Sequence, residues 1–334
     1  MSAANSGRQS ASESDADGAR GRSPRTGMSQ SRFPFPLPYG WFSIGRLDEL
    51  PQVPVAPIRA FDQELVLWRN NDGHHLSDAF CPHLGAHLGH GGRVEDGRLV
   101  CPFHEWTFND AGGNVSIPYA DRPNRKAQLR TYPTMVRNRH LLAWYHPDQT
   151  VAPLWDIPEC LPADPVECLR IDRPVKSVWQ DVAENSVDMA HFKSVHGMSK
   201  VAEVGELTID GYFRRVRSTQ AFKTGRGEIA GEIHSNSHGP GVGVVMFKLM
   251  SEVTLISTVT PIGLEEVHLR FTMYHAAGDE IASKIGQGFG AEVARQLDQD
   301  IPIWEHKRYQ ASPALAPSEK PITEFRRWAS QFYA

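Results

Sequence analysis

Residues 81–83 read Cys-Pro-His, and residues 101–104 read Cys-Pro-Phe-His. Each cysteine is followed closely by a histidine, and 17 residues separate the two pairs. Glycines follow both pairs, beginning at Gly85 and at Gly112, as expected for tight loops. The pattern places four potential metal ligands at the ends of two hairpin-like segments. These ligands are Cys81, His83, Cys101 and His104.

Two cysteines and two histidines can hold either zinc or an iron–sulfur cluster. Zinc fingers usually pair cysteine with cysteine and histidine with histidine, whereas both loops here alternate the two types. The alternation favours a [2Fe–2S] cluster in which Cys81 and Cys101 bind one iron, and His83 and His104 bind the other. Structural zinc is the alternative, and a third interpretation is an unrelated set of buried cysteines and surface histidines.

The segments around these loops predict an all-β domain over residues 39–150. Glu64–Trp68 is strand-like, and Asp96-Gly97 between two short strand-like segments indicates a hairpin. The prolines between residues 147 and 165 mark a joint to a second domain over residues 151–334.

The second domain mixes helical and strand-like segments, which predicts an α+β fold. Residues 178–192 and 281–310 have a helical pattern, and Pro302 interrupts the second of them. Three strand-rich runs lie between them, at residues 206–222, 227–249 and 252–275. Strands covered by helices on one side are typical of α+β domains.

Two glycine-rich segments have the composition of nucleotide-binding loops but not their pattern. Residues 286–290 follow no predicted strand and lack the full G-x-G-x-x-G spacing. Gly239, Gly241 and Gly243 indicate a flexible loop. We therefore expect that neither flavin nor nicotinamide binds this chain.

Composition argues against several classes of function and partner. The 334 residues carry 35 basic and 39 acidic side chains, and the net charge of −4 argues against nucleic-acid and anionic-membrane partners. No stretch has the roughly 18 apolar residues that a membrane helix needs. Residues 1–31 predict a disordered tail without the features of a signal or transit peptide, so we expect a cytoplasmic protein. Cys160 and Cys168 fit no ligand pattern and are expected to be packing thiols.

Asp188, His191 and His196 form a second candidate cluster with the pattern D-x2-H-x4-H. Histidines five positions apart point about 140° away from each other on an ideal helix. Both can bind one metal only if the helix ends or bulges between them, and Gly197 supports an end there. Two solvated histidines are the alternative.

Two histidines and one carboxylate can hold a mononuclear iron and leave positions open for dioxygen and substrate. Asp298 and Asp300 are the candidates for the carboxylate. In helical projection, Asp300 lies within about 60° of the apolar face and Asp298 about 100° away from it. Because an aspartate on a buried face must be paired or bind a metal, we predict Asp300 and keep Asp298 as the alternative.

These motifs resemble those of the Rieske non-haem iron oxygenases. Residues 81–85 and 101–106 resemble the family's Rieske signature, and Asp188, His191, His196 and Asp300 resemble its mononuclear iron site. Residues 185–192 and 300–304, with Lys307, look most like the oxygenase component of ketosteroid 9α-hydroxylase and the sterol 7-desaturases. Glu105 departs from the pattern, since many members have glycine after the cluster histidine.

The resemblance implies an all-β Rieske domain followed by an α+β, helix-grip (START-like) catalytic domain with an antiparallel sheet. It implies a terminal oxygenase, an enzyme whose [2Fe–2S] cluster receives electrons from NAD(P)H through a separate reductase, sometimes with a ferredoxin. A mononuclear Fe(II) would then use O2 to hydroxylate or desaturate the substrate. The expected substrate is an apolar small molecule of the steroid, sterol or similar polycyclic class.

The resemblance also implies a homotrimer or trimer-based hexamer, in which one subunit's cluster faces the iron of the next. Asp188 would be the catalytic carboxylate that bridges the partner subunit's His104 to His191, whereas the alternative is an ordinary surface aspartate. An aromatic-ring dioxygenase or an O-demethylase on the same scaffold is the alternative function. A Rieske electron carrier without catalysis is a more remote one.

Overall fold

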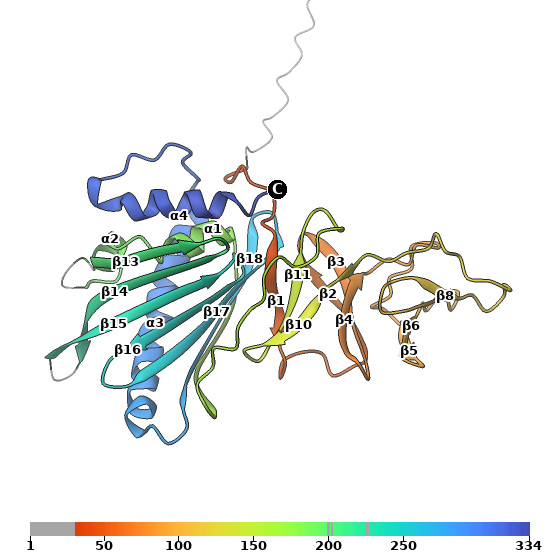
Figure 1. The fold of residues 1–334 in the computed structure, drawn as a ribbon, viewed down its shortest axis with the longest axis horizontal. Coiled ribbons are helices and arrows are strands. Elements are labelled where there is room, and N and C mark those ends of the chain that lie inside the picture. The colour runs from red at the N-terminus through yellow and green to blue at the C-terminus, as the bar shows by residue number, and fades with distance from the viewer. Residues whose placement is uncertain (1–30, 199–200, 202, 225–226) are drawn as a thin grey trace, which may run out of the picture. The chain divides into compact units, whose positions relative to one another are not determined.

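The computed structural model describes residues 31–198, 201, 203–224 and 227–334. All of the predicted tail except Ser31 therefore lies outside the described residues. Small sheets come first along the chain, and a large sheet with helices follows (Figure 1). None of the described helices has both the length and the apolar character needed to cross a membrane.

Residues 40–145 form three small antiparallel sheets, and the described residues of this part contain no helix. The predicted strand at Glu64–Trp68 lies within β3, and the hairpin at Asp96-Gly97 joins β5 to β6. Both turn residues have positive φ, 47° and 72°, as the tight hairpin requires. The strands are β1 (Gly40–Arg46), β2 (Val55–Ala60), β3 (Gln63–Asn70), β4 (Gly73–Asp78), β5 (Arg93–Glu95), β6 (Arg98–Val100), β7 (Thr107–Phe108), β8 (Asn114–Ser116), β9 (Thr131–Tyr132), β10 (Thr134–Arg137) and β11 (His140–Tyr145).

The C-terminal part is built on one seven-stranded antiparallel sheet with the order β12-β18-β17-β16-β15-β14-β13. Each of the three predicted strand-rich runs is a hairpin of two strands, which confirms the α+β class with an antiparallel sheet. The strands are β12 (Pro165–Val175), β13 (Glu203–Asp210), β14 (Phe213–Thr224), β15 (Gly227–His238), β16 (Val242–Lys248), β17 (Glu252–Gly263) and β18 (Glu266–Ala276).

The long helix α3 (Glu280–His306) runs along the sheet (Figure 1). Pro302 lies inside α3 and does not interrupt it, contrary to our expectation. The single helix predicted over residues 178–192 is also wrong in extent, since two short helices replace it. The remaining helices are α1 (Trp179–Glu184), α2 (Ala190–Ser194), a 3₁₀ turn (Pro317–Glu319) and α4 (Lys320–Ser330).

The glycines with loop-like composition have packing roles. Gly286 and Gly290 lie within α3 and approach β12, where an added Cβ would come within 3.1 Å of the Cys168 and Leu169 side chains. At Gly241 an added Cβ would lie only 1.9 Å from a backbone oxygen of Trp41. The flexible loop that we expected around Gly241 is therefore wrong, because the backbone there is tightly packed.

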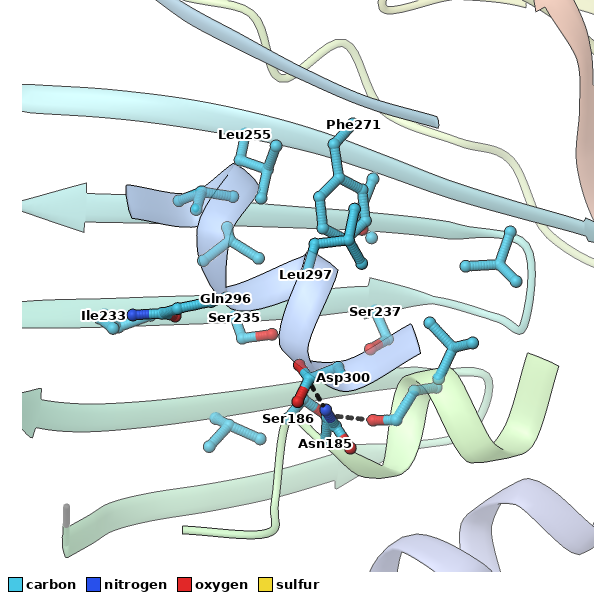
Figure 2. Close-up of a pocket in the computed structure, with 18 of the residues that line it drawn as sticks. Asn185, Ser186, Ile233, Ser235, Ser237, Leu255, Phe271, Gln296, Leu297 and Asp300 are labelled. Atoms are coloured by element: carbon cyan, nitrogen blue, oxygen red, sulfur yellow. Dashed lines mark hydrogen bonds between the residues drawn. The ribbon is translucent and has the colours of Figure 1, made fainter. Parts of the chain in front are cut away.

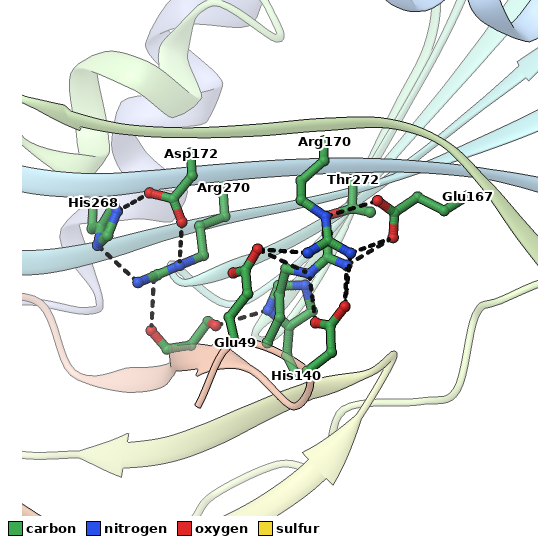
Figure 3. Close-up of polar contacts among 11 residues, drawn as sticks. Glu49, His140, Glu167, Arg170, Asp172, His268, Arg270 and Thr272 are labelled. Atoms are coloured by element: carbon green, nitrogen blue, oxygen red, sulfur yellow. Dashed lines mark hydrogen bonds and ion pairs between the residues drawn. The ribbon is translucent and has the colours of Figure 1, made fainter. Parts of the chain in front are cut away.

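Buried and paired groups fill the predicted joint between the two parts. Trp155 and Ile157, inside the proline-rich stretch, belong to the main hydrophobic core. Arg46 of β1 pairs with Glu167 of β12 at 2.7 Å and donates to Thr272 of β18 at 3.0 Å (Figure 3). Residues 32–334 pack as one compact unit, so the domain division near residue 150 stays a prediction.

Candidate metal centres and the adjoining pocket

The two loops of the first candidate centre share one backbone geometry. In each loop the cysteine N–H, at Cys81 and at Cys101, donates to the carbonyl five residues later at 2.9 Å. The residue four positions after each cysteine has a positive φ, 76° at Gly85 and 56° at Glu105. The matching bonds make each loop a preformed turn that presents its cysteine and histidine together.

Glu105 occupies a position where the backbone favours glycine. A left-handed conformation costs a non-glycine residue roughly 1–2 kcal/mol. The Glu105 carboxylate pairs with Arg93 at 3.0 Å, but both side chains are exposed, so this pair offsets little of that cost. The Cys101 loop nevertheless has the same closing hydrogen bond as the Cys81 loop, which carries Gly85 at the equivalent position.

The four predicted ligand residues of this centre converge at the loop ends. Cys81 and Cys101 are buried, at 3% and 1% exposure. His83 and His104 are partly exposed, with ring centroids 4.8 Å apart. Burial raises the pKa of the Cys81 thiol to about 11, and the neighbouring Cys101 thiol adds to the rise. Since a thiol binds metal as the thiolate, assembly of a metal centre here would release this proton.

The surroundings of the two imidazoles fit a cluster. His104 Nδ1 is buried without a hydrogen-bond partner among the described residues. Such a nitrogen is costly unless it binds a metal or another partner. His83 stacks on Trp106 at 4.3 Å, and the Trp106 indole N–H donates to Tyr119 at 2.8 Å. Buried thiols and rim imidazoles therefore form a donor set that suits a [2Fe–2S] cluster with two histidine ligands.

The second candidate centre depends on the helix ending between its two histidines. α2 stops at Ser194, and Gly197 has a φ of 73°, so the chain turns back after the helix. This turn brings the ring centroids of His191 and His196 to 5.0 Å. The predicted helix end is therefore present.

Asp188 lies just before α2 and orients its first histidine. Its Oδ1 accepts from the backbone N–H of Ala190 at 3.2 Å and of His191 at 3.3 Å. Its backbone carbonyl accepts from His191 Nδ1, which leaves Nε2 of that ring available to a metal. The Asp188 carboxylate lies 4.0 Å from His191 Nδ1 and is about one-third exposed, so it also reaches the surface.

Asp300 joins the two histidines from α3. One potential ligand atom from each of His191, His196 and Asp300 lies within 4.8 Å of the others. Burial raises the pKa of Asp300, whereas the two imidazoles lower it; burial also lowers the pKa of His191. Asp298 is exposed. Two histidines and a buried carboxylate match the facial donor set of a mononuclear iron.

Two amide side chains that the sequence analysis does not single out hold this centre in place. Gln299 Oε1 accepts from His196 Nδ1 at 3.0 Å and from Arg295 Nη1 at 2.9 Å. Asn185 Nδ2 donates to Asp300 Oδ2 at 3.0 Å (Figure 2). Their positions in the sequence could have indicated this role, because Gln299 adjoins Asp300 and Asn185 is a polar residue on the apolar side of the predicted helix.

A mainly apolar cavity of about 240 Å³ adjoins this centre, between the large sheet and helices α1 to α3. Leu297 of α3 faces Leu255 and Phe271 of the sheet across it (Figure 2). His191, His196 and Asp300 also line the cavity. A metal held by these three side chains would therefore face a mainly apolar space.

Family models match most of the chain. Residues 40–133 match the Rieske [2Fe-2S] domain, and residues 143–333 match the 3-Ketosteroid 9alpha-hydroxylase C-terminal domain. The second match alone covers more than half of the chain.

Individual relatives and solved structures are similar over nearly the whole chain. Cholesterol 7-desaturase nvd of Bombyx mori is 29% identical over 91% of this chain and 71% of its own length. A 3-ketosteroid-9-alpha-monooxygenase oxygenase component of Rhodococcus rhodochrous is 29% identical over 88% of this chain and 80% of its own length. The fold is similar to that of Pseudomonas putida CBB5 NdmB (TM-score 0.68, 20% identity, 86% and 89% coverage). It also resembles dicamba monooxygenase bound to 3,6-dichlorosalicylic acid (TM-score 0.70, 16% identity, 88% and 96% coverage).

Proposed function

Because the chain belongs to the family of the 3-ketosteroid 9alpha-hydroxylase C-terminal domain, with a Rieske [2Fe-2S] domain before it, we propose that it is the terminal oxygenase of a multicomponent Rieske monooxygenase. It hydroxylates or desaturates a steroid- or sterol-like polycycle. The observation that carries this function is the cluster of His191, His196 and Asp300 at the wall of an apolar cavity. When bound, the [2Fe–2S] cluster supplies single electrons and the Fe(II) supplies the centre for O2 activation.

Each predicted ligand has a distinct task in this account. The two buried thiols would hold one iron of the cluster and the two rim imidazoles the other, and the His–His–Asp set would hold the Fe(II). The cluster ligands are Cys81, Cys101, His83 and His104, and the Fe(II) ligands are His191, His196 and Asp300. Support comes from the unpartnered His104 Nδ1 and from the convergence of the three buried side chains of the second set.

Asp188 has the catalytic role of linking the two centres. Its backbone carbonyl holds the Nδ1 proton of His191, while its carboxylate reaches the surface. There the carboxylate accepts from the partner subunit's His104, in a homotrimer or a trimer-based hexamer. A carboxylate between two ligand imidazoles orients both rings and couples their protonation.

The substrate class is supported by the cavity and by the relatives. The cavity wall offers mainly apolar contacts to a rigid polycycle. One relative is named a cholesterol 7-desaturase and another a 3-ketosteroid-9-alpha-monooxygenase. An aromatic-ring dioxygenase or O-demethylase is less well supported, because the dicamba monooxygenase similarity lies below 25% identity and concerns the fold alone.

The partners follow from the same role. Electrons come from NAD(P)H through a separate reductase, with or without a ferredoxin, in the cytoplasm. The name "oxygenase component" of the Rhodococcus relatives supports a separate partner component. The Rieske domain spans residues 39–150 and the catalytic domain residues 151–334. A Rieske electron carrier would need neither the second metal set nor the apolar cavity beside it.

Turnover with a substrate panel tests the function. The purified, iron-loaded chain is combined with O2, NADH and a compatible Rieske-oxygenase reductase, and products are identified by mass spectrometry. We expect hydroxylation or desaturation of steroids or sterols coupled to NADH consumption. Coupled turnover of small aromatic acids alone would contradict the proposed substrate class.

A further inference from the structure

One row of residues across the pocket wall is polar. Strand pairing places Arg214 of β14 opposite Ser237 of β15, Ser237 opposite Gly243 of β16, and Gly243 opposite Ser257 of β17. All four residues line the cavity. They form a single row, which we call the polar row.

The neighbouring rows on the same face of the sheet are mostly apolar. One contains a single serine, Ser235, and the next contains a single serine, Ser218. Their other members are Val216, Val245 and Leu255 in the first, and Ile233, Phe247 and Val253 in the second. Polar groups on this wall are therefore concentrated at the end that carries Arg214.

Arg214 is a buried cation that the described residues do not neutralise. Its side chain is 1% exposed, and burial alone lowers its pKa to about 9, so it stays charged at neutral pH. Nη2 donates to Ser186 at 2.7 Å and to Ser237 at 2.9 Å, whereas Nε and Nη1 have no hydrogen-bond partner among the described residues. The guanidinium also lies over the rings of Phe325 and Trp328, at 4.9 and 5.2 Å. A buried charge without a counter-charge favours an electron-rich group nearby.

The two serines of the polar row can present hydrogen-bond donors to the cavity beside this positive charge. Because Ser237 Oγ accepts from Arg214, its own proton is free to donate into the cavity, and the cation behind it strengthens that donor. The Ser257 hydroxyl makes no hydrogen bond within the described part of the chain. A Cβ at Gly243 would lie 2.5 Å from Ser257 Oγ, so glycine leaves room for this hydroxyl.

The polar row also lies at the iron end of the pocket. Ser186, which accepts from Arg214, is next to Asn185 in sequence, and Asn185 donates to Asp300. Ser237, Asn185 and Asp300 all line the same cavity, Ser237 from the sheet and Asp300 from α3 (Figure 2). A group bound by the polar row would therefore be close to the reacting centre.

We propose that the polar row is a subsite for one oxygen substituent of the substrate, a carboxylate or a ketone, which accepts hydrogen bonds from Ser237 and Ser257 beside the Arg214 cation. This inference deepens the proposed function and rests on it for the polycyclic substrate. The substrate is then an amphipathic polycycle whose oxygen-bearing end is held near the iron. An anionic oxygen binds more tightly than a ketone, because the cation behind Ser237 is otherwise unpaired.

Binding of three matched probes tests the subsite. Tryptophan fluorescence, reported by Trp179 and Trp304 in the cavity wall, measures the affinities of androstane-17β-carboxylate, androstan-17-one and androstane. Ser237→Ala and Ser257→Ala remove the proposed donors. Ser218→Ala is the control, since it deletes the same group from the same face two rows away. Arg214→Lys is added only as a second test of charge, because the buried arginine also supports the fold.

We expect Ser237→Ala to weaken carboxylate binding about 10-fold and ketone binding about 3-fold, as loss of one hydrogen bond to a charged or neutral acceptor predicts. Androstane binding should change less than about 2-fold, and Ser218→Ala should spare all three probes. Equal losses for all probes in Ser237→Ala and Ser257→Ala, or no loss in either, would overturn the subsite.

The outcomes separate the subsite from the proposed function. Equal affinity of the unmodified protein for all three probes overturns the subsite and leaves oxygenase activity, which is measured by turnover, unaffected. Failure of all three probes to bind contradicts the polycyclic substrate class and the subsite with it. Selective binding without turnover supports the subsite and counts against the oxygenase.

Discussion

The proposed ligands of the first centre come from two loops that 17 residues separate, whereas six strands lie between His196 and Asp300, proposed ligands of the second. Each cluster loop is closed by its own backbone hydrogen bonds. The iron centre exists only when the turn after α2 packs beside α3. Local geometry therefore builds the centre that passes electrons, and tertiary packing builds the centre that faces substrate.

The two centres also differ in how they meet their surroundings. The cluster loops bury their thiols and leave both imidazoles at the rim, where a partner can approach. The His–His–Asp set is largely buried and opens on an apolar cavity. The contrast suits a centre that exchanges electrons with other proteins and one that must keep water away from a reaction.

Breaking the local centre should have the largest effect. Cys101→Ser removes a thiolate ligand, so we expect the cluster's visible absorption and all turnover to be lost. The iron content should fall by about two of the roughly three irons per chain. About one iron should remain. Cys168→Ser is the matched control, because Cys168 is half-buried and its thiol bonds, among the described residues, only to the Met273 carbonyl. Unchanged absorption in Cys101→Ser would contradict the assignment.

Breaking the centre that depends on tertiary packing should abolish product but spare the cluster. Replacing Asp300 by Ala deletes the buried carboxylate, and turnover should fall by at least about 100-fold. This loss exceeds the one expected when a residue that only orients a ligand is removed. The cluster spectrum should stay unchanged. Asp298→Ala, on the exposed side, should keep full activity. Activity that survives in Asp300→Ala and disappears in Asp298→Ala would exchange the two roles.

A smaller effect is expected when only the orientation of a ligand is disturbed. Gln299→Leu removes the acceptor for His196 Nδ1, and iron affinity measured by chelator competition should fall about 10- to 100-fold. Gln299→Glu retains an acceptor oxygen and should restore most of the affinity. Gln296→Leu, one turn earlier on α3, is the control, since within the described part of the chain the Gln296 side chain bonds only to Glu292. Equal iron loss in both leucine variants would point to a general packing defect.

The smallest expected effect is on the pH dependence of folding stability, through a buried histidine between the small sheets and the large sheet. His140 is 1% exposed, and burial, followed by Arg270 and Arg46, lowers its pKa to about 3, while Asp48 opposes the shift (Figure 3). Between pH 6.5 and 3 the unfolded chain binds a proton that the folded chain does not. The stability from this residue is therefore complete above pH 6.5 and falls with pH, by up to about 2 kcal/mol at pH 5.

Denaturant unfolding at pH 7.5 and pH 5 measures this dependence. His140→Gln should flatten the slope of stability against pH, whereas His306→Gln, at an exposed position, should keep the original slope. A slope that is identical in both variants would show that other groups govern acid sensitivity.

The residues of the local centre are also easier to predict from the sequence than those of the centre that depends on tertiary packing. The four candidate cluster residues could be selected from sequence because C-x-H and C-x2-H are local patterns on tight turns, and their role as ligands stays a prediction. His191 and His196 required the additional step that their spacing forbids a continuous helix, and Asp300 required a helical projection. Gln299 could not be ranked above other polar residues of α3, because only the folded arrangement brings it to His196.

The elements that sequence reasoning missed depend on distant contacts. β12 contains Pro165 and Pro174 and reads as part of a linker, yet it is an edge strand, where proline is tolerated. α4 buries Phe325 and Trp328 against the rest of the core. Its apolar residues recur at helical spacing and Pro321 lies in its first turn, so a local signal was present and was not used. Their packing partners lie far away in sequence.

Metal analysis of the purified chain, combined with Mössbauer spectroscopy, tests the central claim most directly. Two metal centres on one chain predict about three irons. Two of them form an antiferromagnetically coupled [2Fe–2S] pair with unequal ligand sets, and one is high-spin Fe(II). Recovery of a single zinc per chain without visible absorption, or of two irons only, would contradict the account.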